Sequence, residues 1–294
     1  MPELPDITVY VEALARRTRG EPLERATLLN PFVLRTVDPP LAAFEGRMVC
    51  GVERLGKRIA IGFGDEHWLV IHLMVAGRLK WVARSAKPNR RVALAAFDFP
   101  AGTLLLTEAG STRRASLHAV RGAAARAVHD RGGLEVLEAT PDAFAGRLRS
   151  ERHTVKRALA DPRLFSGIGN AYSDEILHRA RLAPTARTDT MDDATVARLH
   201  AAARAVLVEW TERLRDEAGD DWPDNVTAFR PEMAVHGKFK QPCPVCGGLV
   251  QRIAYAENEC NYCPNCQTGG KLLADRALSR LLKSSWPKNA DDLL

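Results

Sequence analysis

The sequence lacks any long hydrophobic run. Its first residues contain no apolar stretch of signal-peptide length, and its longest apolar stretches have the length of single β-strands. The sequence therefore favours neither secretion nor a membrane-spanning helix. It also has no internal repeat and no low-complexity segment. Hydrophobic residues make up 46% and charged residues 27% of the chain, which is typical of a soluble globular protein and argues against disorder.

Cysteine is scarce and unevenly placed. Four of the six cysteines form two C-x2-C pairs, Cys243–Cys246 and Cys263–Cys266, which are separated by sixteen residues. This spacing is typical of a zinc ribbon, in which four thiolates hold one structural Zn2+ and leave no position open for a catalytic water. Disulfides are the alternative, but the pairs favour metal and a cytoplasmic protein. We expect Cys50 to be a small core residue and Cys260 a spare thiol.

Length and charge set further bounds. A chain of 294 residues can hold two domains with ordinary cores. The 42 lysines and arginines exceed the 36 aspartates and glutamates, which gives a net charge of +6. A modest basic excess suits a polyanionic partner without identifying one.

The N-terminal part is expected to be mainly β-structure after one helix at Asp6–Arg17. Short apolar segments separated by turn residues are typical of a β-sandwich or barrel-like unit. The segments are Leu23–Leu29, Met48–Leu55, Ile59–Phe63, Trp68–Met74, Val92–Phe99 and Thr103–Thr107.

Helical periodicity takes over after about residue 130. The expected helical segments are Pro141–Arg149, His153–Leu159, Ser173–Ala180 and Asp192–Glu217. We predict an α+β fold with an N-terminal β-sandwich and its flanking helix at 1–130, a helical domain at 131–236, a cysteine hairpin at 237–267 and a basic helical tail at 268–294.

A glycine-rich turn, Gly167-Ile168-Gly169-Asn170, lies between two expected helices. Glycines let the backbone approach a ligand closely, and the N–H groups that open a helix favour an anion. Asn170 would cap the helix or donate its amide to a phosphate oxygen. Lys156 would supply a second phosphate contact, or it would be an ordinary surface lysine.

The chain starts Met1-Pro2-Glu3. Removal of Met1 would leave Pro2 as a secondary amine, the one form in which a proline nitrogen is nucleophilic. An α-amino group titrates at roughly 7.7–8.0, so part of it is unprotonated near neutral pH. Such an amine can attack a sugar carbon and form an iminium. Taken alone, this start indicates only efficient processing.

In combination, these motifs resemble the formamidopyrimidine-DNA glycosylase/endonuclease VIII family of base-excision repair enzymes, also described as Fpg/Nei or MutM-like. The resemblance covers nearly the whole chain. Its carriers are Pro2–Pro5, Leu55–Lys57, His72–Met74, Gly77–Leu79, Lys156–Leu159, Gly167–Asn170, Tyr172–Glu175 and the cysteine hairpin that ends in Gln267.

The resemblance implies a catalytic role for three residues. Pro2 would attack C1′ of the damaged nucleotide and displace the base. Glu3 would act as the acid/base in sugar-ring opening and later proton transfers. Lys57 would contact the phosphate at the lesion.

The resemblance also implies a DNA-binding role for several residues. Asn170 and Lys156 would form the phosphate clamp of a helix-two-turn-helix domain. Met74 would fill the gap left by the extruded base, although a core methionine on a strand is the alternative.

The sequence departs from the family pattern at four places. Asp6 stands where glutamate is more frequent. The usual Arg-Phe-Gly loop is replaced around Thr112–Ser116, where Arg113 or Arg114 would do the work of the arginine and no aromatic follows. At the hairpin tip the predicted DNA-binding residue Asn258 stands where the family commonly has an arginine. Either the hairpin would then hold DNA less strongly, or Arg252, Lys238 or Lys240 would substitute. The tail is the fourth departure, and its Lys271, Arg276, Arg280 and Lys283 would bind DNA or form a solvated face.

The resemblance implies a monomeric bifunctional DNA glycosylase/AP lyase, associated with the nucleoid, that nicks the strand by β/δ elimination. Its partner would be damaged DNA, with no membrane and no small-molecule cofactor. Its lesion is open, among oxidised bases, ring-opened purines, and abasic or cross-linked sites. Two rivals remain, a non-catalytic DNA-binding paralogue of the same fold and an RNA-binding zinc-ribbon protein.

Overall fold

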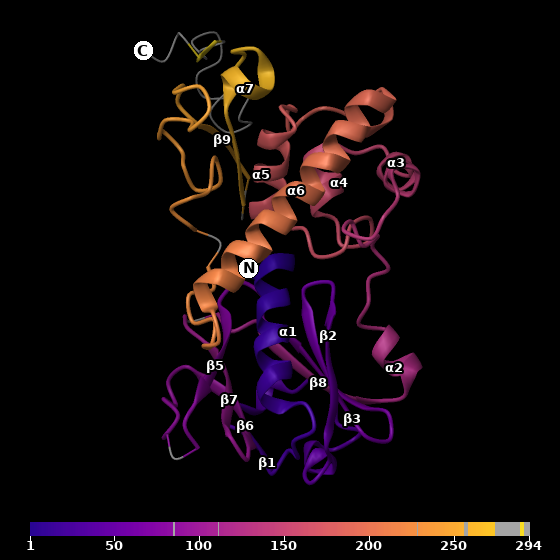
Figure 1. Cartoon of the computed structure of the whole chain (residues 1–294), viewed down its shortest axis with the longest axis vertical. Helices are drawn as coiled ribbons and strands as arrows, with labels where there is room; N and C mark the ends of the chain where they lie inside the picture. Colours follow the sequence, from indigo (N-terminus) through magenta and orange to yellow (C-terminus); the bar gives the residue numbers. More distant parts are fainter. Residues whose placement is uncertain (85, 111, 228, 256–257, 274–288, 291–294) are drawn as a thin grey trace. The chain divides into compact units, whose positions relative to one another are not determined.

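The computed structural model describes residues 1–84, 86–110, 112–227, 229–255, 258–273 and 289–290 (Figure 1). The chain forms two compact units. The first contains Met1–Arg131 and Trp210–Thr227, and the second contains Gly132–Glu209 and Ala228–Leu294. The finer division into four domains stays a prediction.

The first unit begins with helix α1 (Leu4–Thr18). The carboxylate of Asp6 accepts the backbone N–H of Glu3 at 2.9 Å, and Pro5 lies in the first turn, where a missing N–H costs nothing. The inner face of α1 buries Ile7, Tyr10 and Leu14 against strands β2 and β3. These contacts fix the position of the N-terminus.

The first unit also contains two four-stranded antiparallel sheets (Figure 1). One has the order β1-β6-β7-β5 and the other β2-β3-β4-β8. The strands are β1 (Arg25–Leu28), β2 (Val49–Leu55), β3 (Arg58–Phe63), β4 (His67–His72), β5 (Gly77–Val82), β6 (Ala93–Phe99), β7 (Gly102–Glu108) and β8 (Ser116–Arg121).

A hydrophobic core joins α1 and both sheets. It contains Phe44, Ile61, Phe97 and Leu106, each at most 1% exposed. The β2-β3-β4-β8 sheet also buries part of its other face, where Ala60, Val70 and Val120 pack with Ala125 of α2 (Ala123–Ala127). Burial on both faces explains why these strands read as continuous apolar runs rather than as an alternation.

In the described part of the chain, the second unit contains four α-helices before its cysteine hairpin, and the last of them extends into the first unit. Thr140 and Thr154 cap α3 and α4 by accepting backbone N–H groups of Ala143 and Arg157. The helices are α3 (Pro141–Arg149), α4 (Val155–Ala160), α5 (Asn170–Arg179) and α6 (Asp193–Ala218), whose last turns belong to the first unit. Short 3-10 helices occur at Pro31–Val33, Leu41–Phe44 and Thr188–Thr190.

The hairpin consists of β9 (Gln251–Ala254) and β10 (Glu259–Tyr262), followed by α7 (Pro264–Thr268). The predicted α+β class, with a sandwich-like first part, a helical part and a cysteine hairpin, is confirmed. Most of the predicted tail, residues 274–288 and 291–294, lies outside the described residues. Within the described residues, no helix is long and apolar enough to cross a membrane.

Candidate functional site

The start of the chain lies in a largely buried environment. Pro2 is buried, and Glu3 is 2% exposed. Burial lowers the pKa of the N-terminal amine of Met1, the charges of Arg78 and Lys57 lower it further, and Glu3 and Asp6 oppose this shift. An amine in this environment is more often unprotonated at neutral pH than one in water, as a nucleophilic amine requires.

Lys57 occupies the turn between β2 and β3. Gly56 precedes it with a φ of 61°, a left-handed conformation that favours glycine. Because the charge of Lys57 acts on the N-terminal amine, the fold brings the predicted catalytic residues Pro2, Glu3 and Lys57 to one end of α1.

Met74 lies in a turn after β4, not in the strand core. It is partly exposed and has a φ of 52°, which costs a non-glycine residue roughly 1–2 kcal/mol. Arg78 braces this turn by donating to the carbonyls of Val75 and Gly77, at 3.1 and 2.7 Å, and to that of Val226 at 2.6 Å. Met74 is therefore not a buried core methionine, and its role at the DNA stays a prediction.

A buried carboxylate holds the loop that contains Arg113 and Arg114. Glu108, 1% exposed, accepts the backbone N–H of Arg114 at 3.0 Å and that of Ala115 at 2.9 Å. The side chain of Arg113 donates to the carbonyl of Arg91, and both arginines are exposed. Glu108 thus fixes the loop backbone and leaves its two cations at the surface.

His72, at the end of β4, lies in a strongly positive environment. Burial lowers its pKa to about 4, and the charges of Arg58, Lys57, His118 and Arg131 add to this effect. His118 and His129 lie nearby, with ring centroids 4.5 Å apart. His72 is therefore neutral at pH 7 and able to donate one hydrogen bond.

In the second unit, Lys156 is engaged inside the protein. Its ammonium donates to the carboxylate of Asp174 at 2.5 Å and to the carbonyl of Asn170 at 2.6 Å. Asp174 has a fully buried side chain and also accepts from His236 Nδ1 at 2.8 Å and from the backbone N–H of Asn261 at 3.2 Å. The predicted phosphate contact of Lys156 stays a prediction, whereas its ion pair is a structural fact.

Asn170 begins α5, and Gly167 precedes it with a φ of 77°. The turn therefore joins two helices as the sequence predicts. The side-chain amide of Asn170 donates to the carbonyl of Glu259 at 2.9 Å. This bond ties the start of α5 to strand β10 of the hairpin.

Glu175 holds the segment that leads into the hairpin. It accepts the backbone N–H groups of Ala234, Val235 and His236 at 2.8–2.9 Å. Burial raises its pKa, although these three hydrogen bonds oppose the shift. Asp174 and Glu175 together therefore join α5 to two segments of the chain, the one that leads into the hairpin and strand β10 of the hairpin itself.

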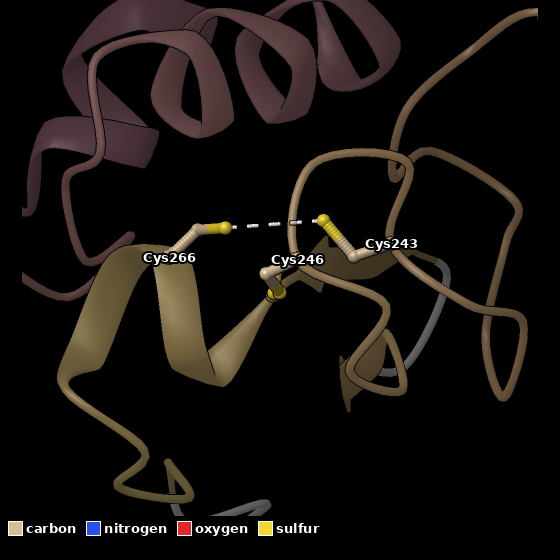
Figure 2. A group of neighbouring side chains, drawn as sticks. Cys243, Cys246 and Cys266 are labelled. Carbon is tan, nitrogen blue, oxygen red and sulfur yellow. Dashed lines mark hydrogen bonds between the residues drawn. The ribbon is translucent and has the colours of Figure 1, made fainter.

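The four predicted metal ligands lie together, and Figure 2 shows three of them, Cys243, Cys246 and Cys266. The Sγ atoms of Cys243, Cys246, Cys263 and Cys266 are all within 4.8 Å of one another. Two of the distances are 3.9 Å, for Cys243 to Cys266, and 3.4 Å, for Cys246 to Cys263. Thiolates at Zn–S distances of about 2.3 Å around a tetrahedral ion lie ~3.8 Å apart, so the cysteines fit one Zn2+.

The surroundings of the cysteines affect their protonation. Burial raises the pKa of the Cys266 thiol to about 11 and raises that of Cys263, so a bound dication is what would keep these thiols deprotonated. His178 Nε2 lies 3.3 Å from Cys243 Sγ, within reach of an N–H···S hydrogen bond of the kind that orients metal ligands.

Two other cysteines differ in placement. Cys50 is exposed, so the prediction of a core residue is wrong: its neighbour Val49 takes the buried side of β2, and successive side chains of a strand face opposite ways. Cys260 is 1% exposed, and burial raises its pKa. It packs in the hairpin with Ile253 and Tyr262.

The hairpin tip carries no cation at the predicted position. Asn258 is exposed, and Glu259 beside it pairs with Arg252 at 3.1 Å. Glu257 lies outside the described residues. The role of this hairpin tip in DNA binding stays a prediction.

Sequence reasoning assigned no role to Arg78, Glu108, Asp174, Glu175 or His236. Arg78 and the Asp174-Glu175 pair stand inside the motifs that carry the family resemblance, which is the signal that could have identified them. Trp222 packs on Tyr10 and Trp81 in the core and donates to the carbonyl of Leu79 at 2.9 Å.

Comparisons with known families and sequences give a consistent result. The model of the formamidopyrimidine-DNA glycosylase N-terminal domain matches residues 1–168, and that of the formamidopyrimidine-DNA glycosylase H2TH domain matches residues 135–217. The formamidopyrimidine-DNA glycosylase of Symbiobacterium thermophilum is 30% identical over 286 residues, 91% of this chain and 89% of the relative. An uncharacterized formamidopyrimidine-DNA glycosylase-like protein of Mycobacterium tuberculosis is 40% identical over 151 residues, 51% of this chain and 94% of that protein.

Solved structures show the same fold. A complex of the Lactococcus lactis Fpg with DNA that contains an abasic site has a TM-score of 0.80 at 22% identity, covering 90% of this chain and 99% of that one. A structure of MutM with DNA that contains carbocyclic 8-oxo-G has a TM-score of 0.79 at 22% identity, covering 91% of this chain and all of that one.

Proposed function

This chain belongs to the formamidopyrimidine-DNA glycosylase family, and from that premise we propose that it is a bifunctional base-excision repair enzyme, a DNA glycosylase with AP lyase activity. The observation that carries the lyase proposal is the environment of the N-terminal amine. Burial together with Arg78 and Lys57 lowers its pKa, and Glu3 lies next to it. Removal of Met1 would move the amine to Pro2, one residue or ~3.8 Å along the chain.

In this proposal the nitrogen of Pro2 attacks C1′ of the damaged nucleotide. The N–C1′ bond forms as the glycosidic bond breaks, and the base leaves with its bonding electrons and takes up a proton. Glu3 protonates the sugar-ring oxygen as the ring opens, which gives the iminium. Loss of a proton from C2′ then expels the 3′ phosphate, a second elimination expels the 5′ phosphate, and hydrolysis of the iminium frees Pro2.

Other residues are proposed to hold the DNA. Lys57 would bind the phosphate at the lesion, and Met74 would fill the gap left by the flipped base, with Arg113 or Arg114 on the opposite strand. Asn170 and Lys156 would form the phosphate clamp, and their bonds within the protein would hold the start of α5 and the hairpin in place. The four cysteines would hold one structural Zn2+ that fixes the hairpin.

Borohydride trapping on duplex DNA with one abasic site tests the proposal. Protein with Pro2 verified as its first residue is expected to form a covalent adduct, and Pro2→Gly or an N-terminal extension is expected to abolish it. Glu3→Gln serves as a matched control, since it keeps the amine and is expected to slow turnover. Absence of any adduct from protein with a verified Pro2 would favour a non-catalytic DNA-binding paralogue.

A panel of lesion oligonucleotides defines the substrate. The altered loop at Thr112–Ser116 makes oxidised pyrimidines, ring-opened purines and abasic or cross-linked sites each worth testing beside 8-oxoguanine. Competition with structured RNA at fixed salt distinguishes the proposed function from the RNA-binding alternative. That alternative predicts that structured RNA displaces abasic duplex DNA from the protein.

A further inference from the structure

Two cations contact one aromatic ring at the base of the cysteine hairpin. The guanidinium carbon of Arg252 lies 4.4 Å from the centroid of the Phe239 ring, and Nζ of Lys240 lies 5.5 Å from it. We propose that Arg252, Phe239 and Lys240, called here the Phe239 clamp, form the DNA-phosphate site of this hairpin and replace the cation missing at Asn258. This inference rests on the proposed function, because it takes DNA as the partner.

The backbone of Lys240 has a strained, left-handed conformation. Its φ is 64°, a conformation that only glycine adopts without strain. Two hydrogen bonds fix the turn, from the backbone N–H of Lys240 to the carbonyl of Val250 at 2.9 Å and from that of Gln241 to the carbonyl of Lys238 at 2.8 Å. A strained lysine held in this way suggests a functional constraint on its side chain.

Arg252 is held on two sides and keeps most of its donors available. It lies on β9, stacks on Phe239 and donates to the carboxylate of Glu259 at 3.1 Å. A guanidinium has five N–H donors, and only one of these bonds to a described residue. The rest can bind a phosphate in a bidentate manner, and stacking reduces the freedom that Arg252 would lose on binding.

Charge also favours an anion at this position. Among the described residues, Lys240 has no carboxylate partner, and Glu259 is the one acidic group paired with Arg252. The neutral Asn258 adds no cation. Arg252 and Lys240 carry two positive charges, of which the carboxylate of Glu259 offsets one. The site beside the aromatic ring is therefore net positive, as in nucleic-acid grooves that combine cations with aromatic side chains. Lys238, the third candidate from the sequence, contacts no ring among the described residues.

Binding to an abasic-analogue duplex, measured by fluorescence anisotropy at four salt concentrations, tests the clamp. Arg252→Gln with Lys240→Gln is expected to weaken binding at least tenfold and to reduce the slope of log K against log salt by about 0.9 for each lost contact. Phe239→Leu keeps both charges and is expected to weaken binding with little change in slope. Glu259→Gln is expected to tighten binding, since it frees Arg252.

The matched control is Arg213→Gln, which removes an arginine that stacks on Trp210 at 4.9 Å, far along the chain from the hairpin. Zinc content equal to that of the unsubstituted protein shows that each variant keeps its hairpin. If the double variant binds DNA with the affinity and slope of the control, or if Phe239→Leu has no effect, the clamp is refuted. Displacement by structured RNA in preference to duplex would also overturn it.

Failure of the clamp is distinguishable from failure of the proposed function. The double variant retains Pro2, so at saturating protein it is expected to give the full borohydride adduct. A protein that gives no adduct but shows the predicted salt slopes would retain the clamp and lose the lyase proposal.

Discussion

Replacement of Asp174 by asparagine is expected to destabilise the second unit by about 3–5 kcal/mol. The side chain of Asp174 is fully buried, and that of Lys156, whose ammonium lies 2.5 Å from it, is only 12% exposed. Asparagine keeps an oxygen that can accept from His236 and Asn261 but removes the charge. The substitution therefore leaves a buried ammonium without its counter-ion, which is the costly way to break a buried pair.

The change can be followed separately in the second unit. Zinc release reports the cysteine hairpin, whereas four of the five tryptophans, Trp68, Trp81, Trp210 and Trp222, belong to the first unit; the fifth, Trp286, lies outside the described residues. With a urea m-value of about 1–3 kcal/mol/M, a loss of about 3 kcal/mol moves the midpoint of zinc release by about 1 M or more. The tryptophan transition is expected to move less.

Lys156→Met provides the second arm of a double-mutant cycle. In the Asp174→Asn background it removes the unpaired charge and replaces it with an apolar chain of similar length, so part of the lost stability is expected to return. This prediction is wrong if the free energy of unfolding of Asp174→Asn lies within about 1 kcal/mol of that of the unsubstituted protein. It is also wrong if Lys156→Met makes the double variant still less stable.

Three further predictions concern pH, strain and metal. The unfolded chain binds a proton at His72 with a pKa near 6.5, whereas the folded chain does so only with a pKa of about 4. The free energy of unfolding is therefore expected to fall by about 2 kcal/mol between pH 7 and pH 5. Urea unfolding of His72→Gln is expected to lack this fall. Met74→Gly is expected to relieve the backbone strain of the left-handed conformation at a φ of 52°. The free energy of unfolding is therefore expected to stay the same or to rise by up to about 1 kcal/mol. Excision from duplex DNA is expected to fall. Arg181→Gly, at a φ of 53°, is the control, and equal loss of excision in both variants would contradict the role of Met74. Metal analysis is expected to find one zinc per chain and less than that in Cys263→Ser, and an unchanged zinc content in this variant would contradict the four-cysteine site.

The elements with strong local signals were predictable from the sequence. Periodicity predicted a helical stretch near Pro141–Arg149, and the structure has a helix with these bounds; cysteine spacing predicted the metal site. Strands β5 and β8 were missed because β5 begins at a glycine that reads as a turn, and because β8 contains His118 and follows a polar loop. A strand of this kind is defined by its partners rather than by its own residues.

The tertiary partners of the site residues could not be predicted in the same way. Nothing local indicates that Lys156 pairs with a carboxylate eighteen residues away, or that Glu175 caps three N–H groups of a distant segment. A helical Asp-Glu pair ordinarily reads as solvated surface. The prediction of a core position for Cys50 was wrong for the opposite reason. Its small apolar side chain suits a core, but the alternation of side chains along the strand gives the buried side to Val49.

The central claim is that the nitrogen of Pro2 forms the covalent bond to the sugar. Tandem mass spectrometry of the borohydride-trapped complex, after nuclease and protease digestion, tests it most directly. We expect the reduced deoxyribose remnant to be attached to the N-terminal nitrogen of the peptide that begins with Pro2. Attachment to a lysine, such as Lys57, or a trapped peptide that still begins with Met1, would contradict it.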